Sequence, residues 1–365
     1  MIYLDHSATS FPKPRAVERA VSRALMCCAN PGRGGYPGAV AADKTVFRCR
    51  EAAADLFACL PEQVVFTSNC THGLNMALGT LIKPGSQVVI SGFEHNAVTR
   101  PLHALGAKIT VAARRLFSWE DTLESFEKAL KRGVDAAVFT HVSNVFGYIL
   151  PVEELSRMCR EKGIPFIIDA AQSAGILPVS FAALGAEFIA MPGHKGLLGP
   201  QGTGILLCAK DVKPLISGGT GSASLEQTMP RELPERGEAG TLNVSGIAGL
   251  LAGIECVKER GREAIHRREA ALAELCAKEL EERGFQVFSG PHQSGVVSFV
   301  GNEDCQEIAG RLAKQGVGVR AGLHCAPLAH ESANTVKTGT VRASFGYGST
   351  FRELRYFLDV LGRNP

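Results

Sequence analysis

Between residues 60 and 210, short apolar runs rich in β-branched residues alternate with segments whose apolar positions recur every three or four residues. The short runs are typical of strands buried on both faces, and the longer segments predict helices of ten or more residues. Strands are expected at 64–68, 86–91, 135–142, 165–171, 188–193 and 204–209. The alternation predicts an α/β fold with a mostly parallel sheet covered by helices on both faces.

The last third of the chain has a different pattern. A helical stretch from about 244 to 283, interrupted at Gly261, leads into short strand-like runs and two further helical segments. We therefore expect two domains. The large α/β domain covers residues 15–250, and a smaller α+β domain combines 1–14 with 251–365.

Composition narrows the classes of protein that remain. The chain has 365 residues, and 39 Lys and Arg nearly balance 36 Asp and Glu, with no basic stripe for a nucleic-acid partner. No stretch approaches the ~18 apolar residues of a membrane-spanning helix, and MIYLDHSATS lacks the pattern of a signal peptide. The eleven cysteines are odd in number and contain no CxxC motif, which indicates reduced thiols. We expect a cytoplasmic protein that binds neither membrane nor nucleic acid.

Unusual polar residues follow the predicted strands, at the edge where ligands bind in parallel sheets. The first strand is followed by the turn NCTHG, which opens a helix; its free N–H groups and the Thr71 hydroxyl favour an anion. The later strand ends carry His95, Asn144, Asp169 with Gln172, and His194 with Lys195. Each of these signals is weak alone, but together they predict one site.

Asp169 and Lys195 are the informative members of this set. Burial of a carboxylate or an ammonium at a strand end is unfavourable unless the charge meets a partner. Pyridoxal phosphate (PLP) requires both groups, because a lysine forms its Schiff base and a carboxylate keeps its pyridinium nitrogen protonated. Its ring needs a stacking partner, for which His95 is suitable, and its phosphate needs a helix start such as that near Thr71. The strand ends therefore predict PLP as the cofactor.

An ordered set of motifs resembles one family along nearly the whole chain. YLDHSATS is followed by EHNAV, SNVFG, DAAQS, GHKGLLGPQGTG, EAGTLN, RAGLHCAPL and VRASFG. In this order the motifs resemble class V, fold-type I PLP-dependent enzymes, specifically the cysteine desulfurase and selenocysteine lyase family. The compact segment before CAPL is similar to the group II branch. The resemblance implies a fold-type I architecture, with a mostly parallel seven-stranded type of sheet in the large domain.

The resemblance also implies which residues hold the cofactor. Lys195 would form the Schiff base, and Asp169 would pair with the pyridinium nitrogen. His95 would stack on the ring, and Gln172 would contact the phenolic oxygen. The phosphate would be held by the N–H of Cys70, by Thr71, by His194, and by Thr241 from the neighbouring subunit of a homodimer.

The same resemblance implies a site for the substrate. Arg342 and Asn144 would bind the substrate carboxylate, a task for which a bidentate guanidinium is well suited; Asn144 would also lie beside the cofactor. Arg320 and His324 are expected to line the substrate site and to favour the thiolate of Cys325 electrostatically.

Cys325, within RAGLHCAPLAH, has three interpretations. On its own it is as readily a buried filler as a nucleophile. A metal site with His324 and His330 lacks a fourth ligand and the paired spacing of structural zinc sites, so no metal is expected. By the resemblance, Cys325 attacks the sulfur of L-cysteine, or the selenium of selenocysteine. Alanine is then released, and Cys325 is left as a persulfide whose outer sulfur is delivered to an acceptor protein.

Four residues depart from the family pattern: His6, Tyr36, Cys70 and Pro192. The departures leave the preference for sulfur or selenium open. Besides a cysteine desulfurase, the alternatives are a selenocysteine lyase or cysteine-sulfinate desulfinase, and an aminotransferase or other lyase of the same fold. A protein of a different class, an idle sulfur-carrier component that keeps PLP for structure, is the last alternative.

Overall fold

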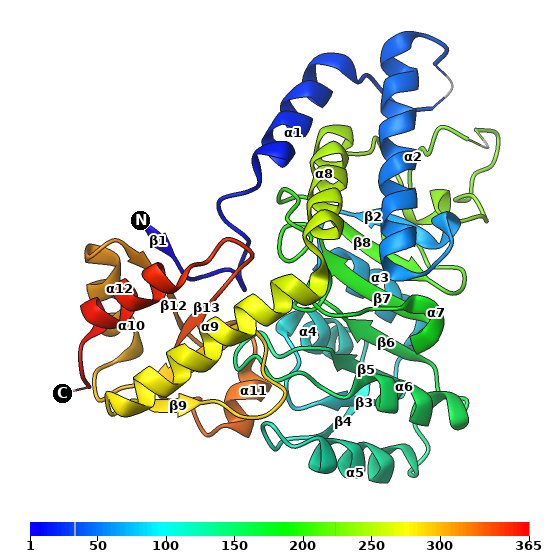
Figure 1. The fold of residues 1–365 in the computed structure, drawn as a ribbon. Helices are drawn as coiled ribbons and strands as arrows, with labels where there is room; N and C mark the ends of the chain where they lie inside the picture. Colours follow the sequence, from blue (N-terminus) through cyan, green and yellow to red (C-terminus); the bar gives the residue numbers. More distant parts are fainter. Residues whose placement is uncertain (33, 223, 365) are drawn as a thin grey trace.

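The computed structural model describes residues 1–32, 34–222 and 224–364 (Figure 1). Within these ranges the largest unit is a seven-stranded sheet of order β2-β8-β7-β6-β5-β3-β4. All neighbouring strands are parallel except at β8, which is antiparallel to β2 and β7. The predicted mostly parallel sheet is confirmed. Its strands are β2 (Val64–Thr67), β3 (Gln87–Ser91), β4 (Lys108–Ala112), β5 (Ala136–Thr140), β6 (Phe166–Asp169), β7 (Phe188–Pro192) and β8 (Gly204–Cys208).

Strand β4 is absent from the sequence prediction. It lies at the edge of the sheet and pairs only with β3. Because of this position Lys108 and Ile109 are exposed, and only Ala112 of the strand is buried. An edge strand of this kind lacks the continuous apolar run by which the other strands are recognised.

The sheet separates two apolar layers, because successive residues of a strand point to opposite faces. In β5, Ala137 and Phe139 pack on one side, and Ala136 and Val138 pack on the other. The first face is covered by α2, α5, α6, α7 and α8, and the second by α3 and α4. None of the described helices combines the length and apolar character that crossing a membrane requires. The helices of this unit are α1 (Arg15–Cys27), α2 (Pro37–Phe57), α3 (Cys70–Leu81), α4 (Asn96–Ala104), α5 (Trp119–Leu130), α6 (Val152–Glu161), α7 (Phe181–Leu184) and α8 (Val244–Arg260).

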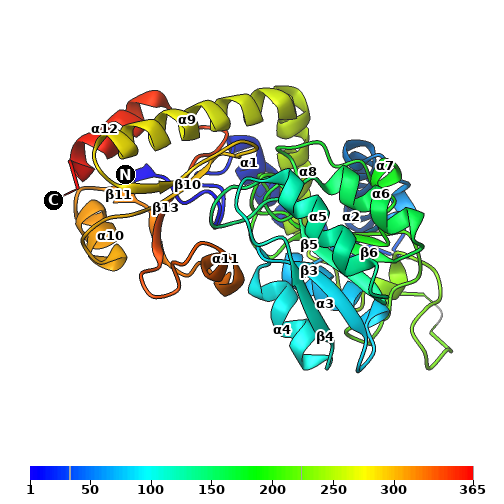
Figure 2. The same ribbon diagram turned by 90° about the horizontal axis from the view of Figure 1, so that it is seen from below.

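A smaller unit with its own apolar core contains the rest of the chain. Its four-stranded antiparallel sheet has the order β12-β13-β10-β9, and helices α9, α10 and α12 pack against it. In Figure 2 this unit lies to one side of the large sheet, with α11 near their junction. Its elements are α9 (Arg262–Glu282), β9 (Gln286–Phe288), β10 (Val296–Val300), α10 (Cys305–Lys314), β11 (Val317–Gly318), β12 (Arg320–Gly322), α11 (Pro327–Ser332), β13 (Thr340–Ser344) and α12 (Phe351–Leu361).

Gly261 separates two long helices. It has a φ of +79°, which glycine adopts without strain, and it stands between the end of α8 and the start of α9. The predicted interruption of the helical stretch is confirmed. Helix α8 packs on α1 and α2 and continues through residue 250, where we expected the domain boundary. We therefore propose that the large domain extends to Gly261, where α9 turns away toward the small unit (Figure 1).

Residues 1–10, which we call the N-terminal strap, connect the two units. Strand β1 (Ile2–Tyr3) pairs in parallel with β11 of the small unit. The N–H of Ser7 donates to Ser344 Oγ at 2.9 Å, on the last strand of the small sheet. The N–H of Ser10 donates to the carbonyl of His194 at 3.0 Å, in the large unit. The strap thus fixes the small unit relative to the loop that follows β7.

A buried ion pair fixes the segment that carries the EAGTLN motif. Both terminal nitrogens of Arg50 donate to the carboxylate of Glu238, each at 2.9 Å. The same carboxylate accepts the N–H of Phe66 at 2.6 Å, and the Arg50 guanidinium lies 4.5 Å from the Phe66 ring centre. A bidentate, hydrogen-bonded pair is the arrangement that offsets the desolvation of two buried charges. It anchors the segment before Thr241 to the start of the sheet.

Candidate active site

The carboxyl ends of the large-sheet strands, together with β12, β13 and the loop between them in the small unit, surround a cavity of about 310 Å³. This cavity is lined by all but one of the residues predicted for the site; Thr241 lies elsewhere. The lining members of that set are Cys70, Thr71, His95, Asn144, Asp169, Gln172, His194, Lys195, Arg320, His324, Cys325 and Arg342.

Asp169 is the last residue of β6, and Lys195 lies in the loop after the neighbouring strand β7. The amine of Lys195 makes no hydrogen bond or ion pair with any residue in the described ranges. Its removal from bulk water lowers its pKa, and the negative charge of Asp169 acts in the opposite direction. Asp169 Oδ1 accepts the N–H of Ala171 at 2.8 Å and the thiol of Cys70 at 3.4 Å, whereas no described residue donates to Oδ2.

Helix α3 begins at the wall of the cavity. Asn69 caps it by accepting the N–H of His72 at 2.9 Å. The N–H groups of Cys70 and Thr71 have no acceptor among the described residues, so the first turn can receive an anion. The Cys70 side chain is buried and points to Asp169, and burial raises the pKa of its thiol.

His95 is held as a neutral ring at the start of α4. Its Nδ1 accepts the N–H of Ala97 at 3.0 Å, which leaves the proton of the neutral ring on Nε2. Burial is the main cause that lowers its pKa. Gln172 donates through Nε2 to the carbonyl of Ser7 at 3.1 Å. Burial likewise lowers the pKa of His194 to about 4, and its Nδ1 is buried without a partner among the described residues.

Cys325 lies on a backbone segment held in a strained conformation. His324 and Cys325 have φ values of +47° and +57°, a region that costs a non-glycine residue about 1–3 kcal/mol. Two hydrogen bonds hold this conformation: Asn144 Nδ2 donates to the His324 carbonyl at 2.8 Å, and the N–H of Asn96 donates to the Cys325 carbonyl at 2.7 Å. The Cys325 residue itself is exposed. The loop is therefore fixed through its carbonyls, with the thiol left accessible.

The expected electrostatic role of His324 is wrong. Its ring is buried, and Nε2 lies 3.1 Å from Thr340 Oγ1 and 3.2 Å from the Thr340 carbonyl. Burial, followed by the positive charge of Arg342, lowers the pKa of His324 to about 2. The ring is neutral at physiological pH and cannot stabilise a thiolate by its charge. It instead packs the loop against β13.

Two arginines share one carboxylate at the small-unit side of the cavity. Arg342 Nη2 donates to Asp5 Oδ1 at 2.7 Å, and Arg320 contacts Asp5 Oδ2 at 2.9 Å. Arg342 Nη1 donates to the Asn144 carbonyl at 2.9 Å, and its Nε is buried without a partner in the described part of the chain. Arg342 is 2% exposed, whereas the side chain of Arg320 is half exposed. The cluster has a net charge of +1.

Thr241 lies in a second cavity of about 240 Å³, together with His72, Gly202 and Asn243. It is exposed, and it makes no hydrogen bond with a described residue. Within one chain, the structure does not bring Thr241 together with Lys195.

Sequence reasoning assigned no role to Ser7 and Asn69, which also line the main cavity, or to Asp5, which pairs with Arg320 and Arg342 beside it. For Asp5 a usable signal was present, since an acidic residue directly after an apolar run also identified Asp169. Asn69 has the sequence signature of a helix cap. The described residues contain no group of three or more histidine, cysteine or carboxylate side chains placed to hold a metal ion, so His324, Cys325 and His330 do not form one.

The residues present fit PLP. The Lys195 amine is unpartnered, as the Schiff-base lysine must be. The unpaired N–H groups of Cys70 and Thr71 suit a phosphate, and the uncommitted Oδ2 of Asp169 suits a pyridinium N–H. Pro192 adds neither hydroxyl nor N–H to this wall.

Comparisons with known proteins identify the family of this chain. The model of the Aminotransferase class-V family matches residues 2–357. A probable cysteine desulfurase of Pyrococcus abyssi is 35% identical over 99% of this chain and 93% of its own length. One of Methanothermobacter thermautotrophicus is 33% identical over 99% and 94%. The apo structure of cysteine desulfurase from Thermococcus onnurineus NA1 superposes with a TM-score of 0.90, at 32% identity, over 99% of this chain and 93% of that one. This chain belongs to the class-V aminotransferase family.

Proposed function

We propose that the protein is a PLP-dependent cysteine desulfurase that converts L-cysteine to L-alanine and leaves a persulfide on Cys325. The observation that carries the proposal is the meeting of three groups in one cavity: the unpartnered amine of Lys195, the carboxylate of Asp169 and the accessible thiol of Cys325. The family is PLP-dependent, and its members among the relatives include cysteine desulfurases.

The residues that would hold PLP come from the strand ends. Lys195 would carry it covalently, Asp169 would face the ring nitrogen, and His95 would stack on the ring. Gln172 would contact the phenolic oxygen. The phosphate would be bound by the N–H of Cys70, Thr71, His194 and Thr241 of a second subunit. When bound, PLP withdraws electrons from the α-carbon of an amino acid.

The protein's own groups would then carry out the reaction. Lys195 Nζ accepts the α-proton, since its lowered pKa raises the fraction of neutral amine. Arg320 and Arg342, with Asp5 between them, leave one positive charge for the substrate carboxylate, beside the buried amide of Asn144. The half-exposed Arg320 is close enough to Cys325 to interact with it electrostatically.

Cys325 would complete the sulfur transfer. Its thiolate forms a bond to the substrate sulfur while the bond between that sulfur and the β-carbon breaks. The electron pair of the broken bond remains on the β-carbon, which then takes a proton. The exposed position of Cys325 allows a cytoplasmic acceptor protein to remove the outer sulfur.

The test is to add L-cysteine to the PLP-loaded protein with a thiol reductant, and to measure alanine and sulfide. We expect both products in equal amounts. A keto acid in place of alanine would identify an aminotransferase, and turnover of selenocysteine or cysteine sulfinate without turnover of cysteine would identify the related lyases. Bound PLP without any turnover would identify an idle carrier component.

We further propose a homodimer in which Thr241 reaches the phosphate of the other subunit. The exposed position of Thr241, in a cavity apart from Lys195, supports this arrangement. Large apolar side chains lie exposed in the chain between β8 and Thr241, and Ile216 lines the same cavity. They are Leu215, Ile216 and Leu225, the last 98% exposed.

Mixing two variants that are each impaired alone, at a limiting concentration of PLP, tests the dimer. Thr241→Ala is expected to weaken PLP binding by about tenfold, the scale of one charge-assisted hydrogen bond. In a mixed dimer of Thr241→Ala and Lys195→Ala chains, one site has both native residues if Thr241 serves the other subunit. That site should bind PLP with the wild-type affinity and restore turnover. If turnover of the mixture does not exceed that of the separate variants, Thr241 does not act across the dimer.

A further inference from the structure

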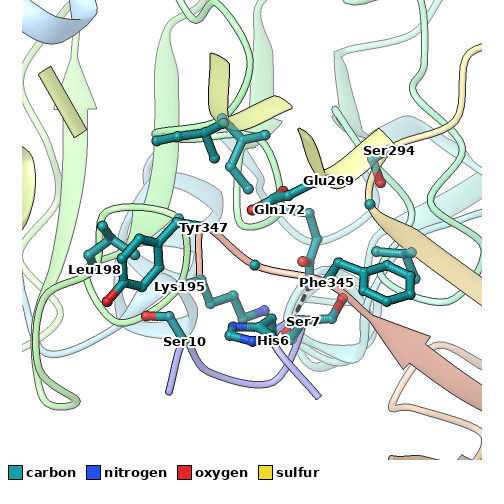
Figure 3. Close-up of a pocket in the computed structure, with 16 residues that line it drawn as sticks. His6, Ser7, Ser10, Gln172, Lys195, Leu198, Glu269, Ser294, Phe345 and Tyr347 are labelled. Carbon is teal, nitrogen blue, oxygen red and sulfur yellow. Dashed lines mark hydrogen bonds between the residues drawn. The ribbon is translucent and has the colours of Figure 1, made fainter. Parts of the chain in front are cut away.

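A third cavity, of about 40 Å³ and distinct from the one that holds Thr241, adjoins the site (Figure 3). We call it the smaller cavity. The two cavities share Ser7, Gln172 and Lys195 as lining residues. In the view of Figure 3, Glu269 and Ser294 lie above the smaller cavity, and Lys195 and His6 lie below it. Its volume has room for about three water molecules.

The smaller cavity collects polar groups that lack partners. Glu269, on α9, is 3% exposed and makes no hydrogen bond or ion pair with any described residue. Ser294 is 5% exposed, and its Oγ is buried without a partner in the described chain. The same holds for Nδ1 of His6. Buried polar atoms without protein partners are expected to bind water, so these groups point to a short water chain that reaches Lys195.

The protonation state of Glu269 follows from its surroundings. Burial raises the pKa of its carboxyl to about 8, so it retains its proton at pH 7. The titratable groups that share the cavity do not reverse this effect: burial lowers the pKa of His6 to about 4, and Tyr347 is a neutral phenol. Lys195 is the basic group on the opposite wall.

The reaction needs a proton that Lys195 alone does not supply. Alanine formation requires a new C–H bond at the α-carbon and another at the β-carbon, whereas Lys195 removes only one proton from the substrate. The second proton balances the one that the Cys325 thiol loses when it becomes a thiolate. Cys325 lies on the wall of the larger cavity, and it does not line the smaller one that holds Glu269.

We propose that Glu269 stores this second proton and passes it to Lys195 through water in the smaller cavity. The inference rests on the proposed function. In the transfer the O–H bond of Glu269 breaks and an N–H bond forms on neutral Lys195. The carboxylate then regains the proton that the Cys325 thiol released to solvent. Glu269 touches neither substrate nor cofactor and acts through Lys195.

Glu269→Gln tests the transfer, because glutamine matches the neutral carboxyl in size and has no proton to release. With L-cysteine at pH 7 we expect kcat to fall at least ~10-fold, less than the ~10²-fold effect of a group that transfers a proton directly to the substrate, with KM unchanged. The wild-type kcat should also fall as pH rises through about 8, where Glu269 loses its proton, and this limb should be absent from the variant. Glu274→Gln, at an exposed position of the same helix, is the matched control and should behave as wild type.

A second measurement separates the proton store from the desulfurase activity. Exchange of the α-hydrogen of L-alanine by the PLP-loaded protein in heavy water would require Lys195 to trade the proton it removes for a deuteron, and it would not use Cys325. We expect this exchange to slow at least ~10-fold in Glu269→Gln. Equal exchange rates in wild type and variant overturn the proton store, whatever the result with cysteine. Absence of alanine and sulfide from cysteine, with exchange that depends on Glu269, instead overturns the proposed function alone.

Thermal unfolding shows whether the substitution acts through protonation. The folded chain retains the Glu269 proton up to about pH 8, whereas the unfolded chain releases it near 4.5. The stability that this proton contributes is complete below 4.5 and is lost as pH rises toward 8. The melting temperature of the wild type should therefore fall more steeply across this window than that of Glu269→Gln. Parallel curves would overturn the assignment of the buried proton to Glu269.

Discussion

Replacement of Lys195 by alanine is expected to reduce alanine formation from L-cysteine at least ~10⁴-fold, the upper range for loss of a general acid–base group. The variant loses both the amine that would carry PLP and the base that would accept the α-proton. The visible absorbance of the protein–PLP Schiff base should disappear as well. The measurements are the absorbance spectrum after PLP loading and the alanine yield.

Lys210→Ala is the matched control for this variant. Lys210 is a surface lysine that pairs with Glu187 at 3.0 Å, just beyond β8. Its loss should leave both the spectrum and the alanine yield unchanged, because exposed ion pairs contribute little to stability. A Lys195→Ala protein that keeps the Schiff-base spectrum would show that another lysine carries the cofactor.

Cys325→Ser is expected to lower sulfur release from L-cysteine by at least about 10³-fold, a scale typical of the loss of a nucleophile. The hydroxyl of serine is a far weaker nucleophile than a thiolate. The change lies on the exposed side of a loop held by its carbonyls, so PLP binding and its spectrum should remain as in the wild type. The measurements are sulfide release and the mass of the peptide that contains residue 325, before and after cysteine.

Cys27→Ser provides the comparison, since Cys27 is the other exposed cysteine among the described residues. It should acquire no persulfide and should show wild-type turnover. If Cys325→Ser still releases sulfide at the wild-type rate, Cys325 is not the nucleophile and an elimination mechanism replaces the persulfide.

The sheet was predictable because its strands are buried on both faces and therefore appear as continuous apolar runs. The same property made the main cavity predictable: Asp169 ends such a run, and Lys195 and His95 follow such runs within a few residues. Strand β4 was not predicted, because it lies at the edge of the sheet and its first residues are exposed. The packing of helix α8 on α1 and α2 beyond residue 250 was not predicted either, because a helix pattern does not reveal which neighbour the helix packs against.

Other features depend on contacts between distant segments, which no local pattern encodes. Asp5 lies between Arg320 and Arg342, and 337 positions in the sequence separate it from Arg342. The neutral state of His324 follows from burial against Thr340, and the unpartnered state of Glu269 follows from the cavity beside it. From sequence, the histidine was expected to be charged, and the glutamate resembled any other acidic residue of a long helix.

The N-terminal strap also has a consequence for the order in which the protein matures on the ribosome. Asp5 is synthesised long before its partner Arg342, which lies on β13, the last strand of the described chain. The Ser7 contact likewise waits for Ser344. A nascent chain can complete the large sheet, with Lys195 in place, while the cluster of Asp5, Arg320 and Arg342 is still missing. The proposed site for the substrate carboxylate is therefore complete only after β13 has emerged from the ribosome.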